Sequence, residues 1–272
     1  MNDRRISWTG QIRIYLGKCW RLFLNEKQWK NFISSFLIIL IICTVTSSDM
    51  FREFKDTKNG AFAVICACIW IGLFNSIQSI CRERAIIKRE HRTGLRISSY
   101  LLAHVIYELF LCAVESVIVL VVMLLRNRLH LPPSGLVFPM AIDMYFVLFF
   151  VTFGADMIAI LISSIVKREN TAMTVMPFVL IIQLVMSGSV FELKGFSEWV
   201  SYITLSKWGL DGICAIANTY EHVHNQCDFA SVKGCDPTAG NLLKIWAILL
   251  GFAVIYIVLS IVVLSQVDKD ER

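Results

Sequence analysis

Five titratable residues of this 272-residue chain fall inside long hydrophobic runs. They are His104, Glu108, Glu115, Asp143 and Asp156. A charge near the middle of a lone membrane helix costs roughly 3 kcal/mol, so each group should face protein, water or a partner, or be protonated. His104, Glu108 and Glu115 follow one another at spacings of four and seven, which places them on nearly one helical face. Two interpretations stay open: structural pairing within a helical bundle, or a proton or substrate path lined by Glu115 or Asp156.

A second polar pair, Asn75 and Gln78, lies three residues apart in another hydrophobic run, on a stripe shared with Ile71 and Phe74. Amides in such a position usually form hydrogen bonds between helices. A pore-lining role is the alternative.

The sequence lacks the short motifs of several enzyme classes. It contains no GxxxxGK[ST] loop for nucleotide phosphates, and no HExxH, GxSxG or GxGxxG pattern. No metal site is predicted, because the closely spaced cysteines and histidines lack further ligands nearby. Cys227 and Cys235 share a polar loop and could form a disulfide if that loop faces an oxidising compartment.

The composition indicates a membrane protein. Hydrophobic residues make up 56% of the chain and charged residues only 17%, with a mean hydropathy of +0.64. The net charge of +5 does not indicate nucleic-acid binding, because Lys and Arg gather beside the hydrophobic runs and form no separate basic domain. We expect no cleaved signal peptide, since no short apolar core with a cleavage site opens the chain.

The elements that must position these residues are helices, and we expect an all-α polytopic membrane protein forming a single transmembrane domain over residues 1–272. An amphipathic helix over 10–30 should lie on the membrane surface, either as an anchor or as a relay of motion to the spans. Apolar runs of about 20 residues are long enough to cross a bilayer. They predict six transmembrane helices, at about 32–47, 61–80, 100–125, 136–166, 171–190 and 242–264.

Two further segments have distinct patterns. Residues 82–97 form a short charged elbow between the second and third spans. Residues 191–241 are external and begin with a stretch too apolar to be fully solvated, which predicts short re-entrant helices. With six spans, 17 Lys and Arg lie on the side of the termini and the elbow, and 8 on the other side. Both termini are therefore expected in the cytoplasm.

The elbow resembles the signature of the membrane domain in the G subfamily of ABC exporters, in the type-2 ABC exporter permease family. That signature reads ER, four positions, RE, three positions, G, five positions, Y, then an EL pair. The matching residues here are Glu83, Arg84, Arg89, Glu90, Gly94, Tyr100, Leu102, Ala103, Glu108 and Leu109. The family's small-residue turn and external helices are matched by Ser187, Gly188, Phe191, Trp199, Tyr202, Trp208, Gly209 and Gly212. Phe110 stands where the family typically has a proline after the EL pair.

The resemblance implies a permease that binds no cofactor itself and works with a separate ABC ATPase subunit that binds ATP and Mg²⁺. It also implies a second permease copy, identical or a paralogue, and a prokaryotic stand-alone permease or a domain cut from a longer protein. The elbow becomes a coupling helix that docks on the ATPase through Glu83, Arg84, Arg89, Glu90, Arg92 and Gly94. Spans two and five of two copies would enclose a substrate cavity lined by Ile71, Phe74, Asn75, Gln78, Met176, Phe178, Leu180 and Leu184.

The expected function is therefore the permease subunit of an ATP-driven exporter, moving an amphipathic or hydrophobic substrate across the cytoplasmic membrane. The alternatives are a transporter or channel driven by an ion gradient, with Glu115 and Asp156 as proton carriers, and a membrane enzyme or scaffold. Internal inverted symmetry would favour the gradient-driven alternative.

Overall fold

The computed structural model describes residues 7–46, 54–127, 135–189, 195–217 and 235–266. Within these ranges the regular elements are all α-helices. They are α1 (Trp8–Asn25), α2 (Lys30–Val45), α3 (Phe54–Ser76), α4 (Ser79–Arg92), α5 (Ile97–Asn127), α6 (Met140–Ile165), α7 (Glu169–Val185), α8 (Phe196–Ser201), α9 (Leu205–Ala217) and α11 (Ala239–Leu264).

Four helical stretches of the described chain are long and apolar enough to cross a membrane: Asp56–Arg92, Ile97–Leu125, Met140–Ile165 and Ala239–Leu264. The first contains α3 and, after a two-residue break, the polar α4. The pair α1 and α2, bent by 69°, can supply a fifth span, and α7 is a shorter apolar helix of 17 residues. The prediction of an all-α, multi-pass membrane protein is confirmed, and the count of six spans stays a prediction.

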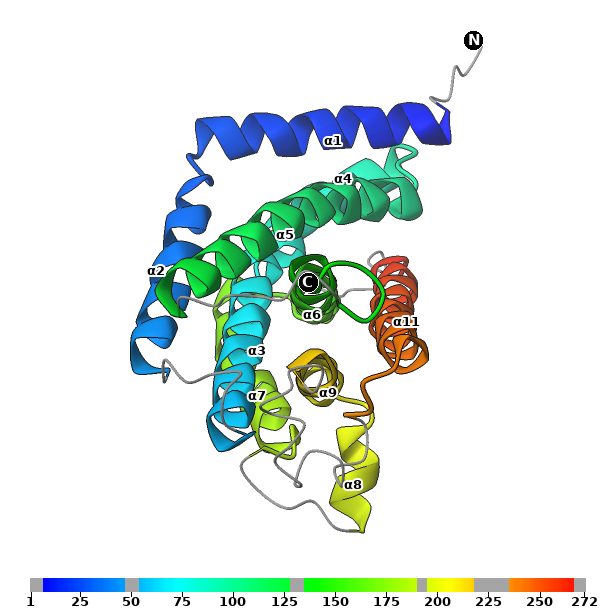
Figure 1. The fold of residues 1–272 in the computed structure, drawn as a ribbon. Helices are drawn as coiled ribbons and strands as arrows, with labels where there is room; N and C mark the ends of the chain where they lie inside the picture. Colours follow the sequence, from blue (N-terminus) through cyan, green and yellow to red (C-terminus); the bar gives the residue numbers. More distant parts are fainter. Residues whose placement is uncertain (1–6, 47–53, 128–134, 190–194, 218–234, 267–272) are drawn as a thin grey trace.

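The helices surround α6, which packs most extensively against α3 and α11 and is buried along most of its length. Figure 1 shows α6 between α3 and α11, with α1 crossing one end of the bundle and α8 at the opposite end. Small residues let the inner helices approach closely: a Cβ on Gly209 of α9 would lie 2.8 Å from a methyl carbon of Val151 on α6. This is the packing expected where apolar burial alone does not hold membrane helices together.

Some helices begin or end away from the predicted boundaries. Helix α6 starts at Met140 and not at Leu136, because Pro139 disfavours helical geometry in the residue before it and lacks an N–H. Helix α7 ends at Val185, before Gly188, which adopts a positive φ of 76°. Helix α4 starts at Ser79, before the predicted start of the charged elbow at Arg82.

The segment predicted to be external contains two described helices. Helix α9 is almost entirely buried and packs against α3, α6 and α11. Helix α8 is short and exposes Phe196 and Trp199, with 84% and 78% of their surface accessible. Cys227 lies outside the described residues, so its pairing with Cys235 stays a prediction.

Candidate functional site

The turn after α4 is closed by a glycine. Gly94 has a φ of +108°, a conformation that residues with side chains rarely adopt. The N–H of Gly94 donates to His91 O at 3.1 Å, and the N–H of Leu95 donates to Glu90 O at 3.0 Å. These two bonds form a Schellman motif, and Leu95, the residue after the glycine, is buried. The chain is thereby turned sharply from α4 into α5.

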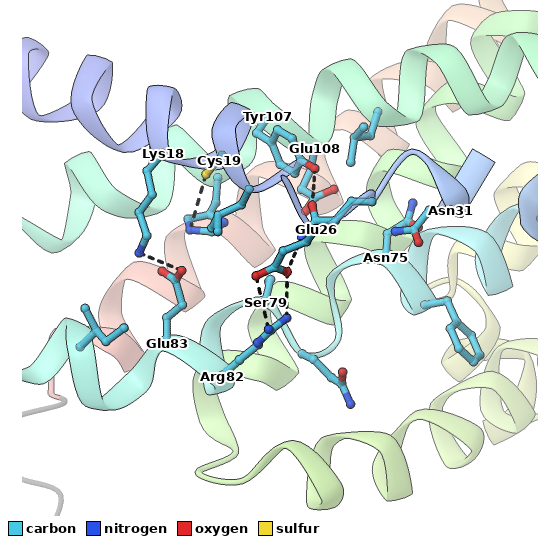
Figure 2. Close-up of a pocket in the computed structure, with 17 residues that line it drawn as sticks. Lys18, Cys19, Glu26, Asn31, Asn75, Ser79, Arg82, Glu83, Tyr107 and Glu108 are labelled. Atoms are coloured by element: carbon cyan, nitrogen blue, oxygen red, sulfur yellow. Dashed lines mark hydrogen bonds and ion pairs between the residues drawn. The ribbon is translucent and has the colours of Figure 1, made fainter. Parts of the chain in front are cut away.

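Helix α1 is joined to this elbow by charged and phenolic side chains. Lys18 Nζ lies 2.8 Å from Glu83 Oε1, and the Tyr100 hydroxyl on α5 donates to Glu83 Oε2 at 2.8 Å. Figure 2 shows Lys18 and Glu83 pointing toward each other from the two helices. The Tyr15 hydroxyl donates to Glu90 Oε2 at 2.7 Å. The Glu83 carboxylate therefore links α1 to α5, and the Glu90 carboxylate holds α1 nearer the turn.

The start of α1 also contacts the turn itself. Gln11 donates through Nε2 to Gly94 O at 3.2 Å and accepts at Oε1 from the Arg96 N–H at 3.0 Å. Trp8 Nε1 donates to the Ser98 hydroxyl at 3.1 Å. Because the bonds run along the length of α1, this helix, α4 and the first turn of α5 form one connected unit.

Two groups on α1 have raised pKa values. Burial, and then the neighbouring Glu90 carboxylate, raises the pKa of Tyr15 above its ordinary value, so the phenol stays protonated and able to donate. Burial raises the pKa of the Cys19 thiol to about 12. Cys19 is therefore a protonated core residue at neutral pH, packed 4.0 Å from His104 Nε2.

The other end of α4 is fixed to α6. The Ser163 hydroxyl on α6 accepts the N–H groups of Ile80 and Cys81, each at 3.0 Å. Arg84 donates to Ser164 O at 2.6 Å, at the C-terminal end of α6. These bonds satisfy backbone groups that helix ends otherwise leave unpaired. A displacement of α4 would consequently act on α1, α5 and α6 together.

Of the predicted coupling residues, Gly94 forms the turn, and Glu83, Arg84 and Glu90 make the contacts described above. The side chains of Arg89 and Arg92 are exposed on α4. The exposed basic side of α4 is thus the part that is accessible to a partner.

A cavity of about 550 Å³ lies beside this unit, bounded by residues of α1, α3, α4 and α5 (Figure 2). Three of the predicted substrate-cavity residues, Phe74, Asn75 and Gln78, line it. Ile71 is buried in the core. The structure therefore brings together three of the four residues predicted on span two.

The residues predicted on span five lie elsewhere, on α7. Met176 and Leu180 are buried in the core, Leu184 is half-buried, and Phe178 is 63% exposed. In this single chain none of them lines the cavity beside α1.

Two of the intramembrane carboxylates, Glu115 and Asp156, form hydrogen bonds between helices. Glu115 accepts from the Ser35 hydroxyl at 3.0 Å and from Asn75 Nδ2 at 2.7 Å. Asp156 accepts from the Ser76 hydroxyl at 2.9 Å and from the Cys112 thiol. These bonds are what structural pairing within a bundle requires, and Asn75 makes the interhelical bond expected of an amide in a membrane helix.

Sequence reasoning missed the residues of α1 that hold the elbow. Gln11, Tyr15 and Lys18 belong to the predicted amphipathic helix, but their spacing gives no indication of which distant residues they contact. The available signal was the opposite charge of Lys18 and the acidic residues of the elbow, which is too general to select one pair.

We expect Tyr15→Phe to loosen α1, because it removes the donor to Glu90 and leaves the ring in its edge-on contact with Tyr100, 5.4 Å between centroids. A hydrogen bond to a charged group contributes about 1.5 to 3 kcal/mol when buried and less when partly exposed, so the loss should be about 1 kcal/mol. Hydrogen exchange of the α1 amides would measure it.

The matched control is Tyr145→Phe, which removes a hydroxyl that makes a long hydrogen bond of 3.4 Å to Ala113 O. Faster exchange across α1 is expected in Tyr15→Phe only. Equal exchange of α1 in the two variants would show that the bond to Glu90 does not hold this helix.

Comparison with known proteins adds two findings. The family described as ABC-2 type transporter matches residues 10–217 of this chain. A relative from Mycobacterium tuberculosis, described as an ABC transporter ATP-binding/permease protein, is 31% identical over 145 residues. The match covers 52% of this chain and only 16% of the relative, so the chain spans a small part of that protein's length.

Proposed function

The chain belongs to the ABC-2 type transporter family, and on this premise we propose that it is the permease subunit of an ATP-driven exporter for an amphipathic or hydrophobic substrate. It would work with a separate ATPase subunit that binds ATP and Mg²⁺, and with a second permease copy in the bilayer. The mycobacterial relative, whose description names both ATP-binding and permease functions, supports the pairing with an ATPase.

The observation that carries the proposal is the connected unit of α1, α4 and the start of α5. A membrane domain driven by a separate ATPase needs a surface that binds the ATPase and a stiff connection from that surface to the membrane spans. Arg89 and Arg92 supply an exposed basic surface on α4, and the bonds of Glu83 and Glu90 supply connections to α1 and α5. Charged surfaces of this kind favour docking with a complementary partner.

The proposed cycle follows from these connections. ATP binding would draw the two ATPases together and push α4 together with α1. Because α4 is bonded to α5 and α6, the push would reach the helices around the cavity and change its access from inward-facing to outward-facing. The proposal includes six spans and cytoplasmic termini, with two copies of span two facing each other. Phe74, Asn75 and Gln78 are its best supported cavity residues, because they already line one pocket.

The alternative driven by an ion gradient has less support. It needs Glu115 or Asp156 to be open to water or ions, whereas both are buried and accept hydrogen bonds from neighbouring helices.

The test is copurification of the full chain with a candidate ATPase. We expect Arg89→Glu to reduce the ATPase retained by about tenfold, equivalent to about 1.4 kcal/mol, because it reverses one charge of the docking surface. The control is Lys244→Glu, a charge reversal at an exposed position near the start of α11. Full retention by Arg89→Glu would remove α4 as the docking element.

A second measurement separates the two energy sources. Transport into vesicles should stop when ATP is depleted and survive collapse of the proton gradient. Transport that persists without ATP and stops with the gradient would favour the ion-driven alternative over the exporter.

A further inference from the structure

One buried acidic atom in the cavity beside α1 has no partner. Glu108 is 2% exposed and lines this cavity. Its Oε2 atom has no hydrogen-bond partner among the described residues. A buried carboxylate oxygen without a donor is costly, and such an atom at the wall of a cavity indicates a ligand that donates to it.

The basic side chains that line the cavity are already engaged. Lys18 Nζ lies 2.8 Å from Glu83 Oε1, and Arg82 contacts both Glu26 oxygens, the nearer at 3.3 Å. Figure 2 shows Arg82 and Glu83 extending from α4 toward Glu26 and Lys18. The wall holds three carboxyl groups, the two engaged bases and His104. A cation beside Glu108 would favour the ionised form of that buried carboxyl group and balance its charge.

One part of the wall is apolar and is suited to an alkyl chain. Leu22, Ile86 and Leu111 line the cavity together with Phe74. The Phe74 ring stacks on Trp70, one turn away on α3, with 6.0 Å between centroids, and both rings are partly exposed. The apolar surface therefore continues from the cavity along α3. The volume of about 550 Å³ is within the range of pockets that hold small ligands.

We propose that this cavity binds the primary ammonium group of an amphiphile, with an N–H donated to Glu108 Oε2 and the apolar chain lying on Phe74 and Trp70. An ionised carboxylate only accepts hydrogen bonds, and a bond from an ammonium is stronger than one from a neutral donor. An alcohol would donate a hydrogen bond to Glu108 but carries no charge. A quaternary ammonium carries the charge but has no N–H to donate. A free alkylamine and an aminophospholipid share the required chemistry.

The cavity shares Phe74, Asn75 and Gln78 with the proposed substrate path. The inference therefore rests on the proposed function in one respect, namely that the bound amphiphile is a candidate for the transported substrate. Binding itself requires this chain alone. A binding assay without the ATPase therefore tests the inference, and the copurification experiment tests the proposed function separately.

The experiment measures binding of radiolabelled dodecylamine to the full chain in phosphatidylcholine nanodiscs, after subtraction of binding to empty nanodiscs. We expect Glu108→Gln to weaken binding at least tenfold, and dodecanol and dodecyltrimethylammonium to compete at least tenfold less well than unlabelled dodecylamine. Glu198→Gln on α8, at the opposite end of the bundle, should bind as the wild type does (Figure 1). Equal binding by Glu108→Gln and wild type, or equal competition by the three head groups, would overturn the proposal.

Two further arms keep the test decisive. Phe74→Ala changes a partly exposed ring and should weaken dodecylamine several-fold while leaving the shorter butylamine unchanged, so it reports on the site even if Glu108→Gln does not fold. A loss that is the same for both chain lengths would contradict the placement of the apolar chain. Phosphatidylethanolamine added to the nanodiscs should displace dodecylamine if the bilayer is the source of the ligand, and leave binding unchanged if the source is a free amine.

Discussion

Gly72→Ala is expected to destabilise the helical bundle more than the same substitution at any other described glycine of a long helix. A Cβ at this position would lie 2.5 Å from the backbone oxygen of Thr152 and 2.9 Å from the Ala155 Cβ. Both neighbours are on α6, the helix that packs most extensively against α3. Neither atom belongs to a flexible side chain, so the two helices would have to separate.

Overpacking of this kind costs typically 1 to 3 kcal/mol, and we expect about 3 kcal/mol here because a backbone atom is the obstacle. The midpoint of thermal unfolding in detergent would measure the effect. Gly251→Ala on α11 is the matched control, because a Cβ there has no neighbour within 4 Å. Equal midpoints for the two alanine variants would mean that α3 and α6 are not packed as closely as the structure shows.

Replacing Asp143 by alanine should have an effect of similar size through lost hydrogen bonds. Its carboxylate is fully buried and accepts the N–H groups of Leu136, Val137 and Phe138 at 2.8, 3.0 and 3.0 Å. These residues precede α6, so alanine would leave three backbone donors without this acceptor. At about 1 kcal/mol each, the expected loss is about 3 kcal/mol.

Asparagine provides the graded comparison at this position. Asp143→Asn keeps one acceptor oxygen and replaces the other with a donor, so its unfolding midpoint should fall between those of wild type and Asp143→Ala. Hydrogen exchange of residues 136–138 should increase in the same order. An alanine variant as stable and as protected as wild type would show that the carboxylate does not hold the start of α6.

The charged elbow was evident in the sequence, and the structure shows that Gly94 ends its helix. Gly94 can be predicted because a helix followed by a sharp reversal needs a residue that tolerates positive φ, and this requirement is local. Glu83 and Glu90 were also predicted to dock on the ATPase, and this role stays a prediction. The structure shows their carboxylates bonded to Lys18, Tyr100 and Tyr15, whereas Arg89 and Arg92 are exposed on α4.

The sequence by itself determined the class of protein and the approximate position of its helices. Apolar runs reveal helices because a membrane leaves the backbone few other ways to satisfy its hydrogen bonds. Only the tertiary structure decided which polar groups meet. Glu115 contacts residues 80 and 40 positions away in the chain, and α1 contacts residues 65 to 90 positions away. Such pairings depend on the rotation and crossing of whole helices, which the local pattern of apolar residues does not specify.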